Sequence, residues 1–199
     1  MKHTIYALTI FALAACTSPQ EEAIDRHALV TRNNPEVTAM DSLSSLSVGN
    51  GEFAYTVDAT GLQTFPEVYK NGVPLGTQSQ WGWHSFGNPE SYKPEEALVE
   101  YDFGHGHKEL YATQPKEPGR AKEASDWYRV NPHRLHLGII GLELENEVRP
   151  SDVQNIQQSL DMWNGIINSR FTLKETPYHI QTVCHPERDM IAADRKSVV

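Results

Sequence analysis

The chain has 199 residues, 39% of them hydrophobic and 22% charged, which fits one globular domain and excludes a disordered or collagenous chain. Its 17 basic and 26 acidic residues give a net charge of −9, so the overall charge opposes attraction to a nucleic-acid backbone. We therefore expect no nucleic-acid partner. The two cysteines, Cys16 and Cys184, are too few for a disulfide framework or a four-cysteine zinc site.

The N-terminal segment, residues 1–15, has the pattern of a signal peptide. Lys2 precedes an apolar run over 5–15 that is too short to span a bilayer. The run ends in Leu-Ala-Ala-Cys at 13–16, which resembles the bacterial lipobox, in which the cysteine thiol accepts a diacylglycerol. We therefore expect lipid attachment at Cys16 and a membrane anchor through that lipid. The alternative is an ordinary secretory signal with an incidental cysteine.

The residues after the cysteine address sorting within the cell envelope. Thr17 and Ser18, with no aspartate beside them, resemble the start of lipoproteins of the outer membrane of Gram-negative bacteria. Residues 16–25 are polar and predict a flexible tether between the lipid and the folded domain.

The body of the chain, residues 26–193, predicts a mainly β fold, an antiparallel β-sandwich with long aromatic-rich loops. Helical periodicity is scarce, whereas alternating apolar and polar segments recur between turn-forming residues. Residues 52–58 read as a strand with Phe53, Tyr55 and Val57 on one face, and the turn after them predicts a hairpin with a second strand at 62–65.

Three further predictions follow along the chain. A long strand is expected over 133–144, with Gly141 permitting a bulge at which the buried face switches. Residues 156–162, 166–173 and 178–185 predict a three-stranded meander with a turn at Trp163 to Gly165. By contrast, the dense glycines and prolines of 68–131 predict long loops without regular elements.

The densest aromatic cluster lies in one of those loops. It comprises Gln80, Trp81, Trp83 and His84, and Gln78 and Asn88 flank it. Sugar rings present apolar C–H faces that stack on indole, and the polar neighbours could hydrogen-bond hydroxyl groups, so the loop suits carbohydrate contact. The alternative, equally supported, is that both tryptophans are buried and pin the loop to the sheet.

Other chemistry-bearing residues give no catalytic or metal site. His105 with His107 and His133 with His136 have no accompanying carboxylate or cysteine cluster at metal-ligand spacing. Cys184 and its neighbour His185 would point to opposite faces of a strand and so form no nucleophilic dyad. The acidic residues nominate no glycosidic acid and base pair.

Four segments carry a resemblance to a known group of enzymes. The segments are 46–54 (LSVGNGEFA), 158–163 (QSLDMW), 167–171 (INSRF) and 183–186 (VCHP). They resemble, in the same order, segments of the N-terminal β-sandwich of six-hairpin glycoside hydrolases with an (α/α)6 barrel, of the α-fucosidase and maltose-phosphorylase type. The resemblance implies a carbohydrate substrate and a sandwich loop that reaches the sugar pocket. It also implies a C-terminal helical barrel that carries the general acid, which this chain does not contain.

The C-terminal hexapeptide 194–199 (DRKSVV) breaks the preceding pattern without a closing element. It is similar to the translation of a common sequencing-library adapter before a stop codon, which indicates a non-native tail and a truncated gene model. The alternative is a natural frayed terminus. We expect an envelope glycoside hydrolase fragment without its catalytic part; the alternative is a non-catalytic glycan-binding or structural envelope lipoprotein.

Overall fold

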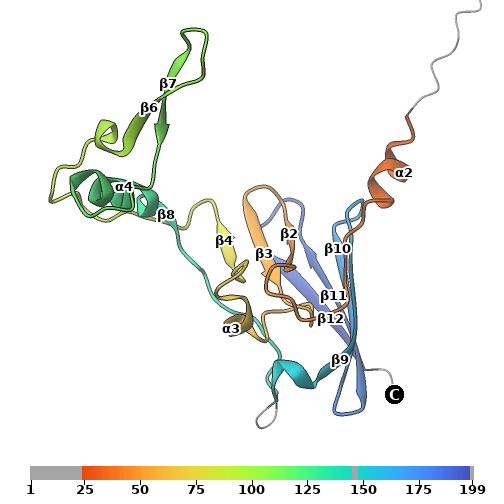
Figure 1. The fold of residues 1–199 in the computed structure, drawn as a ribbon. Coiled ribbons are helices and arrows are strands. Elements are labelled where there is room, and N and C mark those ends of the chain that lie inside the picture. Colours follow the sequence, from red (N-terminus) through yellow and green to blue (C-terminus); the bar gives the residue numbers. More distant parts are fainter. Residues whose placement is uncertain (1–23, 145–147, 198–199) are drawn as a thin grey trace, which may run out of the picture. The chain divides into compact units, whose positions relative to one another are not determined.

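The computed structural model describes residues 24–144 and 148–197 (Figure 1). The expected signal peptide and Cys16 therefore lie outside the described residues. The contacts divide the chain between Asn33 and Asn34. The described part of the first unit holds helix α2 (Arg26–Thr31), which begins where the side chain of Asp25 accepts a hydrogen bond from the Ala28 amide. None of the helices in the described part of the chain is long and apolar enough to cross a membrane.

The second unit is mainly β and antiparallel, which confirms the predicted fold class. A five-stranded sheet has the order β1-β9-β10-β11-β12, and a three-stranded sheet has the order β2-β3-β4. The five strands of the first sheet are β1 (Glu36–Val37), β9 (Val153–Asp161), β10 (Ile166–Leu173), β11 (Thr176–Cys184) and β12 (Ile191–Ser197). The second sheet comprises β2 (Leu46–Gly49), β3 (Phe53–Val57) and β4 (Thr77–Ser79).

The hydrophobic core joins the buried faces of these two sheets. Phe53, Tyr55 and Val57 of β3 are buried, as their alternation predicts. Ile167 of β10 and Ile180 of β11 are fully buried in the same cluster. The meander over β9, β10 and β11 is also confirmed, with Ile166 opposite Asp161 on one side and opposite Val183 on the other. Burial on one face fixes the register of each of these strands.

The hairpin expected after β3 is wrong. β3 pairs with β2 and β4, and residues 62–65 form no strand. Instead, Asp58 organises the following loop: its side chain accepts hydrogen bonds from the backbone amides of Thr60 and Phe65, each at 2.7 Å. A short polar side chain that binds backbone amides in this way competes with a strand ladder.

The long strand expected over 133–144 is also wrong, because only β8 (His133–Arg134) forms a strand and pairs with β5 (Trp83–His84). The rest of the segment makes isolated backbone hydrogen bonds, including Leu137 to Thr77 and Gln63 to Ile140. Gly141 does not mark a bulge. It lies against the backbone of Gln63, so close that a Cβ there would stand 2.7 Å from the Gln63 carbonyl oxygen.

Regular elements also occur where only loops were expected, between residues 68 and 131. Helix α4 follows Gly119 and ends before Asn131 and Pro132, residues that punctuate a helix as well as a loop. An exposed hairpin precedes it. Besides β4 and β5, the elements of this region and its borders are α3 (Pro66–Tyr69), η1 (Pro94–Ala97), β6 (Leu98–Asp102), β7 (Lys108–Ala112) and α4 (Arg120–Val130). A further 3-10 turn, η2 (Pro150–Asp152), precedes β9.

The expectation that the C-terminal hexapeptide forms no element is wrong for its first four residues. Asp194 to Ser197 belong to β12 and pair with β11, with Arg195 opposite Ile180. Backbone pairing of this kind accepts almost any side chain on the exposed face of an edge strand. The non-native origin of 194–199 stays a prediction.

Candidate functional site

Both tryptophans of the predicted sugar-contacting loop are exposed. Trp81, in the turn after β4, exposes 66% of its surface, and Trp83 of β5 exposes 50%. The alternative in which both tryptophans are buried is therefore wrong. Sugar contact through the exposed indoles stays a prediction.

Trp81 is held in place by a loop of the other sheet. Its indole Nε1 donates a hydrogen bond of 2.7 Å to Oδ2 of Asp189, in the turn between β11 and β12. Ser79 donates to the same oxygen at 2.5 Å. Asn50 fixes the turn further by donating to the Arg188 carbonyl oxygen at 3.0 Å. The hydrogen bond from Ser79, and after it the one from Trp81, lowers the pKa of the Asp189 carboxyl.

Trp83 is paired with a cation. Arg134 lies opposite it across the β5–β8 ladder, and the guanidinium carbon stands 4.3 Å from the indole ring centroid. This is a cation–π contact. The Arg134 guanidinium also donates a hydrogen bond of 2.8 Å to the Ser79 carbonyl oxygen, so the side chain is fixed at two points.

The other two predicted contact residues lie differently. His84 follows Trp83 on the same strand, so their side chains point to opposite faces. The His84 ring contacts Phe86 and His133, at centroid distances of 4.7 and 5.1 Å. Gln80 is exposed, and its backbone amide donates to the Glu52 carbonyl oxygen. The structure thus brings Gln80 beside the tryptophans but turns His84 away from Trp83.

A hollow of about 320 Å³ opens between Arg134 and the three-stranded sheet. Glu52, Gln78 and Arg134 are among the residues that line it. Sequence reasoning named Gln78 but missed Glu52 and Arg134. Arg134 could be found only from the pairing of β5 with β8, because nothing near it in the sequence marks it.

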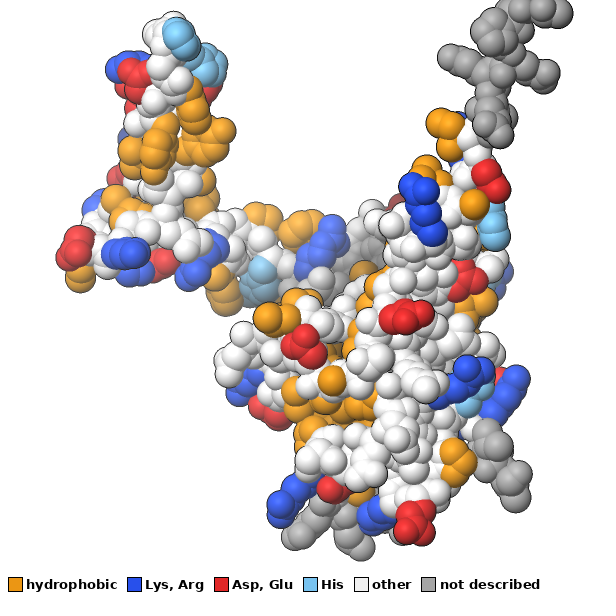
Figure 2. Space-filling model, turned by 45° about the vertical axis from the view of Figure 1, so that its right-hand side comes forward, with side chains coloured by type: hydrophobic (Ala, Val, Ile, Leu, Met, Phe, Trp, Pro, Cys, Tyr) orange, Lys and Arg blue, Asp and Glu red, His pale blue; other side chains and the backbone are white. Residues whose placement is uncertain are grey.

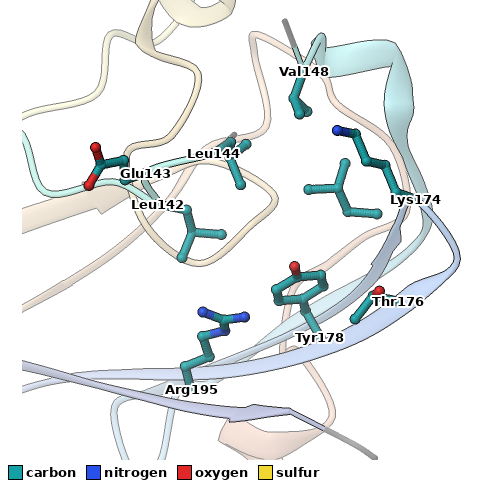
Figure 3. Close-up of a pocket in the computed structure, with 9 residues that line it drawn as sticks. Leu142, Glu143, Leu144, Val148, Lys174, Thr176, Tyr178 and Arg195 are labelled. Carbon is teal, nitrogen blue, oxygen red and sulfur yellow. The ribbon is translucent and has the colours of Figure 1, made fainter. Parts of the chain in front are cut away.

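A second hollow, of about 310 Å³, lies beside the turn between β10 and β11 of the five-stranded sheet (Figure 3). Leu142, Leu144 and Tyr178 form much of its wall, and Arg195 points into it from β12. Arg195 belongs to the hexapeptide that the sequence indicates to be non-native. We therefore assign no function to this hollow.

A third group of exposed aromatic residues lies on the hairpin of β6 and β7, where Figure 2 shows hydrophobic side chains gathered at the surface. Tyr101, Phe103 and Tyr111 line a groove of about 290 Å³ with Ala112. The Phe103 and Tyr111 ring centroids are 5.6 Å apart. No charged side chain lines this groove, so it offers less for hydroxyl recognition than the hollow beside Trp83.

The structure also places the histidines and the cysteine that the sequence analysis considered as ligands or nucleophiles. His105 and His107 lie in the turn between β6 and β7, and His136 accepts a hydrogen bond from the Thr77 amide. Within the described residues, no group of three or more metal-ligating side chains comes together. Burial, and secondarily the charge of Asp189, raises the pKa of the Cys184 thiol, which opposes a nucleophilic thiolate.

No protein-family model, curated protein or solved structure matches this chain.

Proposed function

We propose that this chain binds carbohydrate through the exposed indoles of Trp81 and Trp83. The observation that carries the proposal is the placement of two exposed, anchored tryptophans, one of which contacts Arg134, a residue that lines a neighbouring hollow. Anchored indoles offer flat apolar faces to the C–H face of a sugar at little cost in side-chain entropy. The neighbouring amide, carboxylate and guanidinium groups can bind hydroxyl groups.

The wider setting of this binding surface is part of the same proposal. The segments at 46–54 and 158–163 resemble glycoside hydrolase sandwiches. The first lies on β2 and β3 of the three-stranded sheet and the second on β9 of the five-stranded sheet, and these two sheets share the core. We propose that the chain is the sandwich part of such an enzyme, with the acid and base residues on a helical barrel outside it. The resemblance of residues 13–16 to a lipobox supports attachment to the cell envelope through a lipid on Cys16, and Thr17 and Ser18 after it support sorting to the outer membrane.

The experiment measures the binding of the full chain to a panel of oligosaccharides that includes maltose-type and fucosylated compounds. We expect at least one to bind, and expect Trp81→Ala and Trp83→Ala each to weaken binding about tenfold, the equivalent of about 1.4 kcal/mol. Trp163→Ala is the matched control, because Trp163 is half exposed and lies in the β9–β10 turn. The proposal fails if no oligosaccharide binds or if Trp163→Ala weakens binding equally.

Lipid attachment is tested separately in bacterial cells. Metabolic labelling with a radioactive fatty acid is expected to mark the wild-type chain. Cys16→Ser is expected to remove the label, whereas Cys184→Ser retains it because Cys184 lies in β11 of the folded domain. Label that persists in Cys16→Ser contradicts the lipobox interpretation.

A further inference from the structure

The hollow beside Trp83 has a floor of unusually small side chains. The outward-facing residues Ser47, Gly49 and Ala54 of β2 and β3 lie along it. Gly49 has no room for a larger residue, because a Cβ there would stand 2.5 Å from the Phe53 carbonyl oxygen. Small residues thus leave the outer face of this sheet open to a ligand.

The walls of the hollow carry one fixed cation and one carboxylate. The contacts of Arg134 with Trp83 and with the Ser79 carbonyl oxygen use one face and one N–H group, which leaves further N–H donors for a ligand. The backbone of Glu52 is fixed by Asn50 and Gln80. Within the described residues, Glu52 and Arg134 form no ion pair with each other or with another side chain.

This pair of opposite charges selects for an uncharged, hydroxyl-bearing ligand. A hydroxyl group both donates and accepts, so it can donate to the Glu52 carboxylate and accept from the Arg134 guanidinium. An anionic ligand would be attracted by Arg134 but repelled by Glu52. A cationic ligand would be attracted by Glu52 but repelled by Arg134. The volume of about 320 Å³ lies at the lower end of the range of ligand pockets and suits a single sugar ring.

We propose that this hollow is a subsite for one neutral sugar ring, in which Glu52 and Arg134 bind hydroxyl groups and exclude sugars that carry a carboxylate. The inference rests on the proposed carbohydrate binding at Trp81 and Trp83, and it adds the class of sugar and the residues that select it. Gln78, from β4, supplies a further amide to the same ring.

The charge test uses the tightest-binding neutral oligosaccharide of the panel and the same compound with one primary hydroxyl oxidised to a carboxylate. The full wild-type chain is expected to bind the neutral form at least tenfold more tightly. Glu52→Gln, which removes the repelling charge, is expected to narrow that preference at least threefold. Glu67→Gln, an exposed control in α3 that changes the net charge equally, is expected to leave the preference unchanged.

The steric test fills the hollow without altering its charges. Ala54→Phe on the outer face of β3 is expected to weaken binding of the neutral form at least tenfold. Gln157→Phe, at an exposed position of β9 in the other sheet and outside the lining, is expected to change it less than threefold. Circular dichroism of both variants reports whether the sheet has formed.

The outcomes separate this inference from the proposed function. Loss of binding in Trp83→Ala, together with unchanged affinity in Ala54→Phe and an unchanged preference in Glu52→Gln, overturns the subsite and leaves the tryptophan surface intact. A wild-type preference for the carboxylated form also overturns it. The absence of any oligosaccharide binding overturns both.

Discussion

The indole of Trp81 donates its hydrogen bond to the carboxylate of Asp189, at 2.7 Å, across 108 positions of sequence. Trp81 follows β4 of the three-stranded sheet, and Asp189 lies in the turn between β11 and β12 of the five-stranded sheet. The orientation of the exposed indole therefore depends on both sheets. A substitution in the β11–β12 turn should therefore change the orientation of Trp81 at the binding surface.

We expect Asp189→Ala to release Trp81 and to weaken carbohydrate binding roughly threefold to tenfold. Its carboxylate also accepts a hydrogen bond from Ser79, which lines the hollow beside Trp83, so the effect combines the lost orientation of the indole with the release of the Ser79 side chain. Tryptophan fluorescence anisotropy should fall in Asp189→Ala relative to wild type. Glu187→Ala, in the same turn, is the control and should change neither measurement.

The same contact predicts a dependence on pH. Hydrogen bonds from Ser79 and Trp81 lower the pKa of Asp189 in the folded chain below the usual value of about 4. Because the folded pKa is depressed, the stabilising contribution is complete above about pH 4 and is lost as pH falls through the folded value.

The measurement is the fluorescence of the wild-type chain between pH 6 and 2, minus that of Trp81→Phe. We expect a transition below pH 4 in the difference. Asp189→Asn should lack this transition, because an amide does not titrate there. A transition that survives in Asp189→Asn would assign the effect to another carboxyl.

Asp58 predicts the opposite dependence of stability on pH. The residue is fully buried, and burial raises the pKa of its carboxyl despite hydrogen bonds from Thr60 and Phe65. A raised folded pKa means that the native state binds the proton more tightly, so the free energy of unfolding decreases as pH rises from about 4 through the folded value.

Asp58→Ala is expected to lower the free energy of unfolding at pH 7 by about 2–6 kcal/mol, because each of the two amides left without an acceptor costs about 1–3 kcal/mol. It should also remove the decrease that begins at about pH 4. Urea unfolding from that pH upward measures both effects, and Asp102→Ala, on the exposed hairpin, is the control. An unchanged pH profile in Asp58→Ala would contradict the assignment.

The sequence predicted the fold where burial on one face dictates the pattern. The meander of β9, β10 and β11 follows directly from alternation, because side chains such as Ile167 and Ile180 fill the core. The sequence pattern did not predict the elements whose side chains face solvent. Helix α4 buries only Ala124 and Ser125, so its sequence has no apolar stripe that would predict a helix. Both strands of the β6–β7 hairpin are exposed along almost their whole length.

The candidate site shows the same limit. Trp81 and Trp83 were found from the sequence because they are close together and surrounded by turn formers. Arg134 and Asp189 were not, because each reaches the tryptophans only through the pairing of distant segments. His84 was placed beside Trp83 on sequence proximity alone, whereas the alternation of the β5 strand turns it to the other face.

Gly141 provides a direct test of the packing that replaced the expected strand. Its neighbours Ile140 and Leu142 are hydrogen-bonded to Gln63 and Thr64, so the two segments cannot separate without breaking those bonds. A Cβ at Gly141 would stand 2.7 Å from the Gln63 carbonyl oxygen. Gly141→Ala is therefore expected to lower the free energy of unfolding by about 1–3 kcal/mol, the usual cost of overpacking.

Gly87→Ala is the matched control for this substitution. Gly87 has no positive φ and no atom within 4 Å of its added Cβ, so alanine there should leave stability unchanged or raise it by up to about 1 kcal/mol. Urea unfolding of the two variants and the wild type measures the difference. A larger loss of stability in Gly141→Ala than in Gly87→Ala is the expected result. Equal stability of the two variants would contradict the close approach of Gly141 to the Gln63 backbone.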